Sequence, residues 1–261
     1  SKFYLRTGNG KHQMDYSEIR SAFVEGGEQP ERLRQWRNER IREILSPSPV
    51  IPPPDGPKCI LHVVPFGFNR DRAFLGSLKS HEAVSDFPTP GMGCTHYRLN
   101  LDGFLNFTAA SERGMAGPGL SYCQVFRSGA VEAVWGDIAY EESGVRVLRG
   151  AWHEQTLVNS VGTYTNRLHG LGAQFPFVVF VSLTGLKNCS LQSGRAWRHS
   201  REVVDRDLVT LPELIMEQHP DDLPLIMKET MDVLWQAGGL EGSPHFNAQG
   251  QWTGEPLSFP K

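Results

Sequence analysis

The sequence predicts an α+β fold: an antiparallel or mixed sheet built from hairpins and flanked by helices. Two observations support this class. Segments of strand character are joined in pairs by tight turns, among them Asp102-Gly103 and Ser128-Gly129, and such turns favour antiparallel hairpins. The helical segments do not alternate with single strands, as they would in a parallel sheet. Before this unit we expect the remnant of an N-terminal domain, in the order strand, helix, helix.

The first unit, residues 1–45, is expected to be the end of that N-terminal domain. Residues 3–6 have strand character and run into the turn Gly8-Asn9-Gly10, after which Asp15 can cap a helix. The Glu-Gly-Gly-Glu stretch at residues 25–28 should end this helix, and a second helix should follow over residues 30–45. The opening strand needs partners from later or from upstream sequence. Because the chain has no initiator Met, we expect the upstream part to be missing.

The predicted helix over residues 30–45 combines one apolar face with many charges. Five arginines and three glutamates occupy the other faces. The pattern is typical of a solvated helix with intrahelical ion pairs. The alternative is an arginine ridge that contacts a phosphate backbone. The apolar residues that recur at helical spacing are Leu33, Trp36, Ile41, Ile44 and Leu45.

Residues 46–57 contain six prolines in twelve positions and mark the clearest boundary in the sequence. Proline fixes φ and lacks an amide hydrogen, so such a stretch neither continues a helix nor joins a ladder. We interpret it as a stiff, extended linker. A ligand for an SH3-type domain is the alternative.

The remaining residues, 58–261, are expected to form one α+β domain. A buried strand, a short helix and two hairpins come first, followed by a helix that Gly172 closes and a nearly all-apolar strand central to the sheet. One more strand and a final helix precede a tail rich in Pro, Gly and Asn. In order, these elements are predicted at residues 59–65, 71–79, 97–107, 122–138, 154–171, 176–186, 203–211 and 221–237.

The composition is that of an ordinary soluble globular protein. Hydrophobic residues make up 39% and charged residues 21% of the 261 positions, which provides enough apolar sequence for a core. No apolar run approaches the ~18 residues of a membrane span, so no membrane partner is expected. The four cysteines show no C-x-x-C spacing, and we interpret them as reduced thiols.

Sequence motifs for catalysis or cofactor binding are not found. The turn around Gly8 fits neither the Walker A pattern nor the dinucleotide fingerprint. The histidines show no H-E-x-x-H spacing, and no G-x-S-x-G elbow occurs. We therefore predict no catalytic residue, no metal ligand and no specific cofactor. A backbone nest at this turn, with Arg6 and Lys11 beside it, could hold one nucleic-acid phosphate; the alternative is a plain strand-to-helix turn.

A second basic segment follows the predicted central strand. Residues 187–201 contain Arg195, Arg198 and Trp197 among serines and glycines. Arginine can bind a backbone phosphate while an aromatic ring stacks on a base, so this segment is a candidate for nucleic-acid contact. An exposed charged loop without a ligand is the alternative.

Several segments resemble one family of bacterial proteins. The opening strand, its Gly-x-Gly turn and the helix after it are similar to the closing strand and helix of the Alba-type, Schlafen-like DNA-binding domain. Downstream segments resemble the C-terminal half of one branch of the same proteins. The segments that carry the resemblance are residues 3–6, 14–23, 98–103, 124–134, 211–213, 234–239 and 246–252.

The resemblance implies a nucleic-acid-associated protein of the cytoplasm. Such proteins are often labelled ATP-binding, although this sequence contains no phosphate-binding motif. Nuclease-active Schlafen relatives use acidic residues upstream of the closing strand, and that portion is absent here. No catalytic residue is therefore carried over. Only Arg6, on the closing strand, transfers with positional support.

Three functional hypotheses follow. The first is a non-catalytic module that binds DNA or RNA through Arg6, Lys11, Arg195 and Arg198. The second is part of a metal-dependent nuclease whose carboxylates lie upstream of this chain. In the third, residues 58–261 sense a ligand or form a homo-oligomer without contacting nucleic acid.

Overall fold

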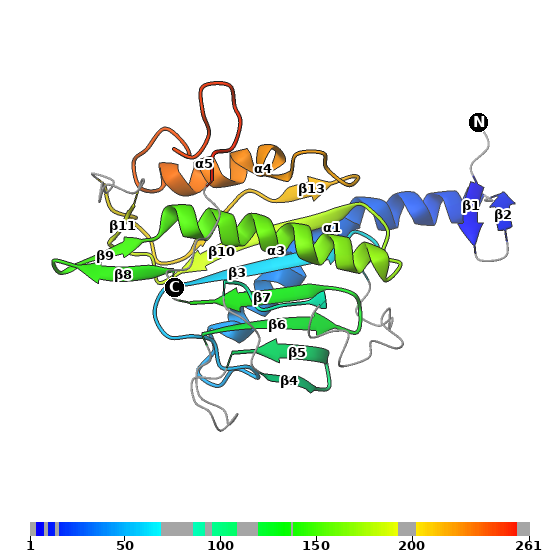
Figure 1. The fold of residues 1–261 in the computed structure, drawn as a ribbon. Helices are drawn as coiled ribbons and strands as arrows, with labels where there is room; N and C mark the ends of the chain where they lie inside the picture. The colour runs from blue at the N-terminus through cyan, green and yellow to red at the C-terminus, as the bar shows by residue number, and fades with distance from the viewer. Residues whose placement is uncertain are drawn as a thin grey trace.

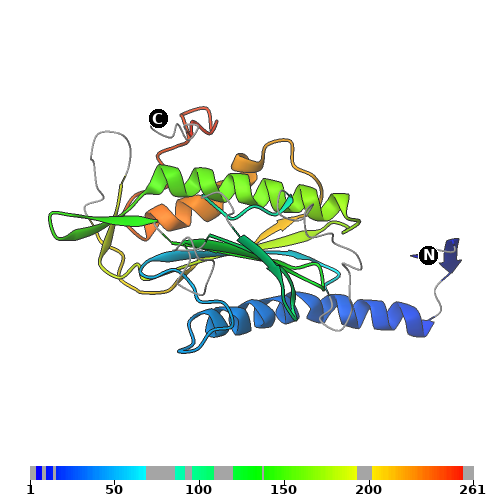
Figure 2. The same ribbon diagram turned by 60° about the horizontal axis from the view of Figure 1, so that its bottom comes forward.

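The computed structural model describes residues 4–7, 10–13, 16–68, 86–91, 96–108, 120–136, 138–192 and 202–254, with side chains from residue 28 onward. These residues form an α+β fold with three layers. A sheet of eight strands lies between helix α1 (Tyr16–Ile44) on one face and helices α3 (Gly150–Gly170) and α5 (Lys228–Gln236) on the other (Figure 2). The predicted fold class is confirmed at this level.

All ladders of the eight-stranded sheet are antiparallel. The strand order is β12-β10-β3-β7-β6-β5-β4, and β13 also pairs with β10. The predicted hairpins are both present, as β4–β5 and β6–β7. The strands are β3 (Lys58–Pro65), β4 (His96–Leu99), β5 (Gly103–Phe107), β6 (Ser121–Phe126), β7 (Val131–Trp135), β10 (Phe177–Thr184), β12 (Val209–Thr210) and β13 (Leu214–Met216).

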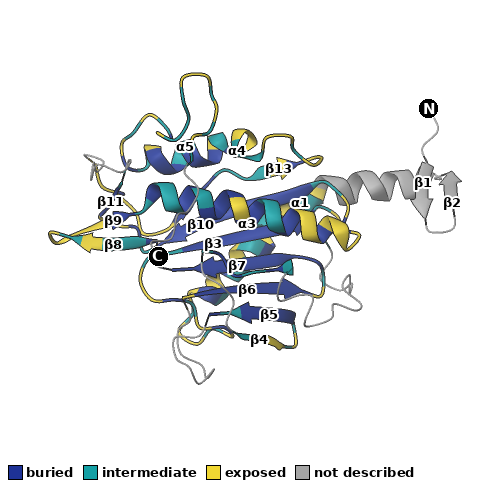
Figure 3. Ribbon diagram, in the orientation of Figure 1, coloured by how far each residue is buried: buried dark blue, intermediate teal, exposed yellow. Residues whose placement is uncertain are grey.

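The centre of the sheet is apolar on both faces. Strands β3 and β10 pair along eight residues each, and nearly all of those residues are buried (Figure 3). A continuous apolar run suits a strand that helices cover on both sides, because neither set of alternating side chains reaches water. This explains why both strands could be predicted from the sequence although neither shows an alternating pattern of apolar and polar residues.

The N-terminal elements differ from the prediction in two respects. Residues after the opening strand form a second strand, so β1 (Tyr4–Thr7) and β2 (Gly10–Gln13) make a two-stranded hairpin. The predicted break at residues 25–28 was wrong, because α1 continues through it and through Pro30. A glycine pair costs a helix about 2 kcal/mol, and an interior proline costs about 3 kcal/mol more. Packing of the later part of α1 on the sheet, through Leu33, Trp36, Ile41 and Ile44, outweighs a cost of this size.

The opposite face of the sheet carries the main core. Helix α3 contributes Leu157, Val161, Tyr164 and Leu168 to it, and α5 contributes Met231 and Trp235. Helix α3 ends as predicted: Leu171 follows its last residue, and Gly172 adopts a φ of 99°. This left-handed conformation is the one that glycine adopts without steric cost at a helix end.

Other elements of the C-terminal half were predicted less well. The final helix is divided into α4 (Leu223–Ile226) and α5, and the strand expected over residues 203–211 is reduced to β12. A small mixed sheet was not predicted. It has the order β11-β9-β8 and consists of β8 (Ala139–Glu142), β9 (Val145–Leu148) and β11 (Cys189–Leu191), in which β11 and β9 are parallel. The helix predicted over residues 71–79 lies outside the described residues.

Two expectations about composition can be checked on the described part of the chain. Cys59, Cys123 and Cys189 are buried free thiols, as the reading of reduced cysteines requires. No helix in the described ranges has both the length and the apolar character to cross a membrane.

Candidate functional site

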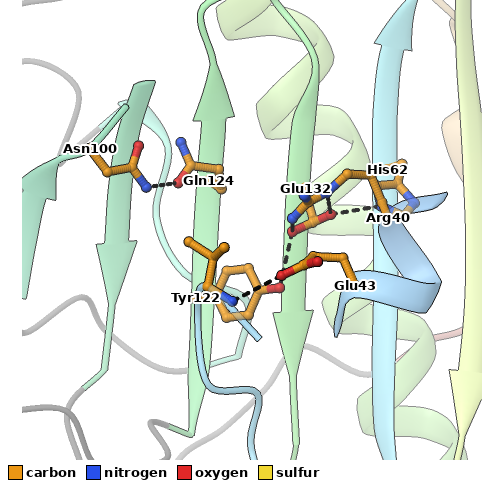
Figure 4. A network of polar contacts seen from close by, with 8 residues as sticks. Arg40, Glu43, His62, Asn100, Tyr122, Gln124 and Glu132 are labelled. Atoms are coloured by element: carbon orange, nitrogen blue, oxygen red, sulfur yellow. Dashed lines mark hydrogen bonds and ion pairs between the residues drawn. The ribbon is translucent and has the colours of Figure 1, made fainter. Parts of the chain in front are cut away.

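A buried carboxylate, Glu132, lies at the centre of the sheet face that α1 covers (Figure 4). Arg40 of α1 donates to both of its oxygens, from Nε to Oε2 at 2.8 Å and from Nη2 to Oε1 at 3.0 Å. The Tyr122 hydroxyl donates to Oε1 at 3.0 Å, and His62 Nε2 lies 3.1 Å from Oε2. Each carboxylate oxygen therefore has two partners.

The sheet register brings these polar residues together. His62 on β3 is opposite Glu132 on β7, and Glu132 is opposite Gln124 on β6. Gln124 continues the polar row toward the sheet edge, because its Oε1 accepts a hydrogen bond from the Asn100 side chain at 2.6 Å (Figure 4). Directly opposed residues of neighbouring strands project on the same face, so the row is a consequence of strand alignment.

Apolar clusters on both sides isolate this polar row from water. One contains Leu33, Trp36 and Phe180, and the other contains Ile41, Ile60 and Val134. A buried carboxylate is tolerated where a cation and further hydrogen-bond donors satisfy it. The network thus joins α1 to the sheet at its middle.

The charge states of the network follow from these contacts. Burial raises the pKa of Glu132, but hydrogen bonds from His62 and Arg40, and the charge of Arg40, lower it to about 2. Burial lowers the pKa of His62, against the opposing effect of Glu132. The carboxylate is therefore ionised and the imidazole neutral at neutral pH. In that state His62 Nε2 donates to Glu132, and Nδ1 has no hydrogen-bond partner among the described residues.

A surface groove of about 470 Å³ opens beside the outer end of Arg40. One wall is the stripe of α1 formed by Trp36, Glu39, Arg40 and Glu43, which are spaced so that they share one face of the helix. The turns β4–β5 and β6–β7 and the residue Phe68 form the rest of the lining. The lining residues outside α1 are Phe68, Leu101, Asp102, Phe126, Arg127 and Ser128.

Three of the residues that line the groove are aromatic. The guanidinium carbon of Arg40 lies 5.1 Å from the centroid of the Phe126 ring. Trp36 contacts both Phe68 and Phe126, with ring centroids 5.2 and 5.6 Å apart. Arg127 joins the two turns, because its Nε donates to the Leu101 carbonyl at 3.1 Å. The groove therefore combines aromatic surface with both signs of charge.

A second buried carboxylate, Glu154 of α3, lies on the other side of the sheet. Its Oε1 accepts from Trp235 Nε1 at 2.5 Å, and its Oε2 lies 2.7 Å from His245 Nδ1 and 3.4 Å from Trp252 Nε1. Burial raises the pKa of Glu154, but the contacts led by His245 lower it overall. His245 Nε2 is buried and unpartnered within the described ranges. The arrangement holds the segment after α5 against α3.

The residues predicted to contact nucleic acid fall into two groups. Arg6 lies on β1 and Lys11 on β2, at directly opposed positions of the hairpin ladder. Arg195 and Arg198 lie outside the described residues.

The arginines of α1 combine the predicted ion pairs with contacts that were not predicted. Arg32 forms an intrahelical pair with Glu28. Arg34 pairs with Glu31 inside the helix and also makes a two-point pair with Glu213. Arg40 makes a two-point pair with Glu132, and both Glu213 and Glu132 are far away in the sequence.

Neither the buried network of His62, Tyr122 and Glu132 nor the one around Glu154 was predicted from the sequence. One sign was available, since a glutamate inside the apolar segment of β7 must be paired if that strand is buried. Its partners come from a helix and two other strands, and the sequence alone does not supply that register. Within the ranges that the structure describes, no group of three or more His, Cys, Asp or Glu residues could hold a metal ion.

Comparison with known proteins gives no relative: no protein-family model, no curated protein and no solved structure matches the chain. The resemblance to Schlafen-like proteins therefore stays a prediction.

Proposed function

We propose that this chain is a non-catalytic, nucleic-acid-associated module that contacts a phosphate backbone through the β1–β2 hairpin. The observation that carries the proposal is the placement of Arg6 directly opposite Lys11 in the ladder. Like charges at opposed positions destabilise a strand pair. Bound phosphate would relieve that repulsion, and residues 1–14 contain no Asp or Glu that would do so.

The position of the hairpin supports this role. It lies at the far end of α1, away from the eight-stranded sheet (Figure 1). The acidic excess of the sequence lies in residues 207–261, outside the hairpin. A basic hairpin that stands away from the sheet can attract the phosphate backbone of DNA or RNA.

Fluorescence anisotropy of the chain with duplex DNA, single-stranded DNA and structured RNA tests the proposal. Binding should weaken as salt rises, because each neutralised phosphate releases counterions. The plot of log affinity against log salt has a negative slope, and the variant Arg6→Glu/Lys11→Glu should make that slope shallower by about 2. Arg32→Glu is a matched control, since Arg32 is an exposed arginine already paired with Glu28. Absence of binding to all three nucleic acids, or equal losses in both variants, would contradict the proposal.

The groove beside Arg40 favours a second candidate function, the binding of a small organic ligand. Its volume of about 470 Å³ lies in the range of ligand sites, which are roughly 300–1,000 Å³. Aromatic rings and a few fixed charged groups also match the usual lining of such sites. A ligand with a flat apolar part could contact the Phe68 side of the groove, with its polar groups on Arg40 or Asp102.

Ligand-observed NMR with a library of small aromatic compounds tests this second function. Ser128→Trp should fill the groove and remove the binding of any compound found. Ser48→Trp is the control, because Ser48 is exposed and outside the groove. Binding that survives Ser128→Trp would place the compound elsewhere.

A further inference from the structure

Both arginines that line the groove beside Arg40 already bind acceptors of the protein itself. Arg40 makes its two-point pair with the buried carboxylate of Glu132 (Figure 4). Arg127 donates from Nε to the Leu101 carbonyl at 3.1 Å and from Nη2 to the Asn100 carbonyl at 3.5 Å. Each guanidinium thus has two of its three nitrogens engaged within the chain, which leaves less of it for an anionic ligand.

The carboxylates of the groove outnumber its arginines. Glu39 and Glu43 lie one turn apart on α1, and Asp102 lines the same groove from the turn between β4 and β5. All three side chains are only partly buried. Because Glu132 balances the charge of Arg40, these three carboxylates are opposed by one remaining guanidinium, and the groove has a formal excess of two negative charges. A cleft with such an excess concentrates cations and repels anions.

The aromatic surface of the groove acts in the same direction. Trp36 contacts both Phe68 and Phe126, so the three rings form one cluster. Phe68 is half-buried and the other two rings are nearly covered, which makes Phe68 the open part of this surface. The face of an aromatic ring carries partial negative charge and attracts cations. The Arg40 guanidinium, 5.1 Å from the centroid of Phe126, already uses this attraction within the chain.

We propose that the groove binds a small organic cation in which an ammonium or guanidinium group is joined to a flat apolar body. The inference rests on the ligand-binding role proposed above for this groove and adds the class of ligand. The cationic group lies among Glu39, Glu43 and Asp102, where it donates charge-assisted hydrogen bonds, and the apolar body covers Phe68. A groove of about 470 Å³ has room for such a molecule.

Three compounds that share one ring system test the preference for a cation. Tryptamine, tryptophol and indole-3-acetate contain the same indole ring but are cationic, neutral and anionic at neutral pH. We expect tryptamine to bind about fivefold more tightly than tryptophol, because it adds an ion pair and a cation–π contact at a partly exposed site. Indole-3-acetate should bind most weakly. NMR titrations of the full chain at low salt, where charges are least screened, give the three dissociation constants.

The variant Asp102→Asn tests the position of the cationic group. It removes one negative charge and keeps the hairpin turn, because Asn-Gly favours the same turn as Asp-Gly. Tryptamine binding should weaken by about threefold to fivefold, whereas tryptophol binding should not change. Asp221→Asn is the matched control, since Asp221 is exposed and does not line the groove. It should leave the binding of both compounds unchanged.

The possible results separate this inference from the role on which it rests. If no compound of the series or of the wider library binds, the groove is not a ligand site, and both fail. If tryptophol or indole-3-acetate binds as tightly as tryptamine and Ser128→Trp removes that binding, the groove takes ligands without preferring cations, and the inference alone is overturned. Tryptamine binding that survives Ser128→Trp, or that Asp102→Asn leaves unchanged, would place the cation elsewhere and also overturn it.

Discussion

Arg40 and Glu132 form a two-point ion pair between α1 and β7, although 92 positions separate them in the sequence. The pair is bidentate and charge-assisted, which is the geometry that favours arginine over lysine. Tyr122 and His62 complete the coordination of the carboxylate. One residue of α1 thus fixes the position of the helix relative to three strands of the sheet.

Replacing Glu132 with Gln should destabilise the protein by about 3 kcal/mol, because breaking a buried ion pair leaves its partner without a counter-charge. Urea unfolding measures the change. The double variant Arg40→Met/Glu132→Leu should recover much of the loss, since apolar residues of similar volume often replace a buried pair without cost. A single-variant loss below about 1 kcal/mol would show that the pair is effectively solvated.

The contribution of Glu132 should also depend on pH. Its pKa is about 2 in the folded protein, below the value near 4.5 expected in the unfolded chain. A carboxylate with a lowered folded pKa stabilises the fold above its unfolded pKa, and this stabilisation is lost as pH falls toward the folded pKa. The difference in unfolding free energy between the parent and Glu132→Gln should therefore shrink between about pH 4.5 and 2. A difference that is constant over this interval would contradict the assignment.

Substitution of His153 by Phe should stabilise the protein. His153 is fully buried and stacks on Trp135, with ring centroids 5.8 Å apart. Neither of its ring nitrogens has a hydrogen-bond partner among the described residues, and each unsatisfied buried polar group costs about 1–3 kcal/mol. Phenylalanine keeps the stacking and removes that cost. A loss of stability would instead show that water or another group pairs with the imidazole.

The pH dependence of the same variant provides a second test. Burial lowers the pKa of His153 to about 4, so the unfolded chain takes up a proton at higher pH than the folded one. The free energy of unfolding therefore decreases as pH falls from about 6.5 to 4, by at most about 1.4 kcal/mol per pH unit. His153→Phe should flatten the stability profile in this interval. Thermal melts at a series of pH values compare the two chains.

The sequence was most informative where one segment determines its own structure. Four features could be predicted from the sequence, because each depends on local conformation or on burial of the whole segment. They are the Asp102-Gly103 and Ser128-Gly129 turns, the apolar run of β10 and the Gly172 end of α3. The continuity of α1 could not be predicted, since packing on the sheet outweighs the cost of the glycines and Pro30. The Glu132 site could not be predicted either. Its four residues come from four elements, and only the strand register aligns them.

Gly150→Ala and Gly162→Ala should have opposite consequences, although both positions lie in α3. A Cβ at Gly150 would overlap the Trp235 ring and lie 2.9 Å from the Gln192 carbonyl oxygen, so we expect a loss of about 1–3 kcal/mol from overpacking. At Gly162 the nearest atom is the flexible Leu223 Cδ2 at 3.2 Å. There the gain in helix propensity of about 1 kcal/mol should match or exceed the crowding. Equal effects in urea unfolding would show that Trp235 moves aside.

Glu154→Gln should loosen the segment after α5 without unfolding the sheet. The carboxylate forms hydrogen bonds with Trp235 of α5 and with His245 and Trp252 of the segment that follows α5. The amide keeps the shape but cannot accept on both sides, so at least one of these donors loses its partner. Hydrogen exchange measured by mass spectrometry should therefore become faster in residues 243–253, while β3 and β10 stay protected, because local opening needs less free energy than global unfolding. Glu229→Gln is the control, since Glu229 is an exposed glutamate of α5 and its loss should leave the exchange pattern unchanged. If exchange rises equally across β3 and β10, Glu154 supports the whole core, and the segment is not a separate unit of stability.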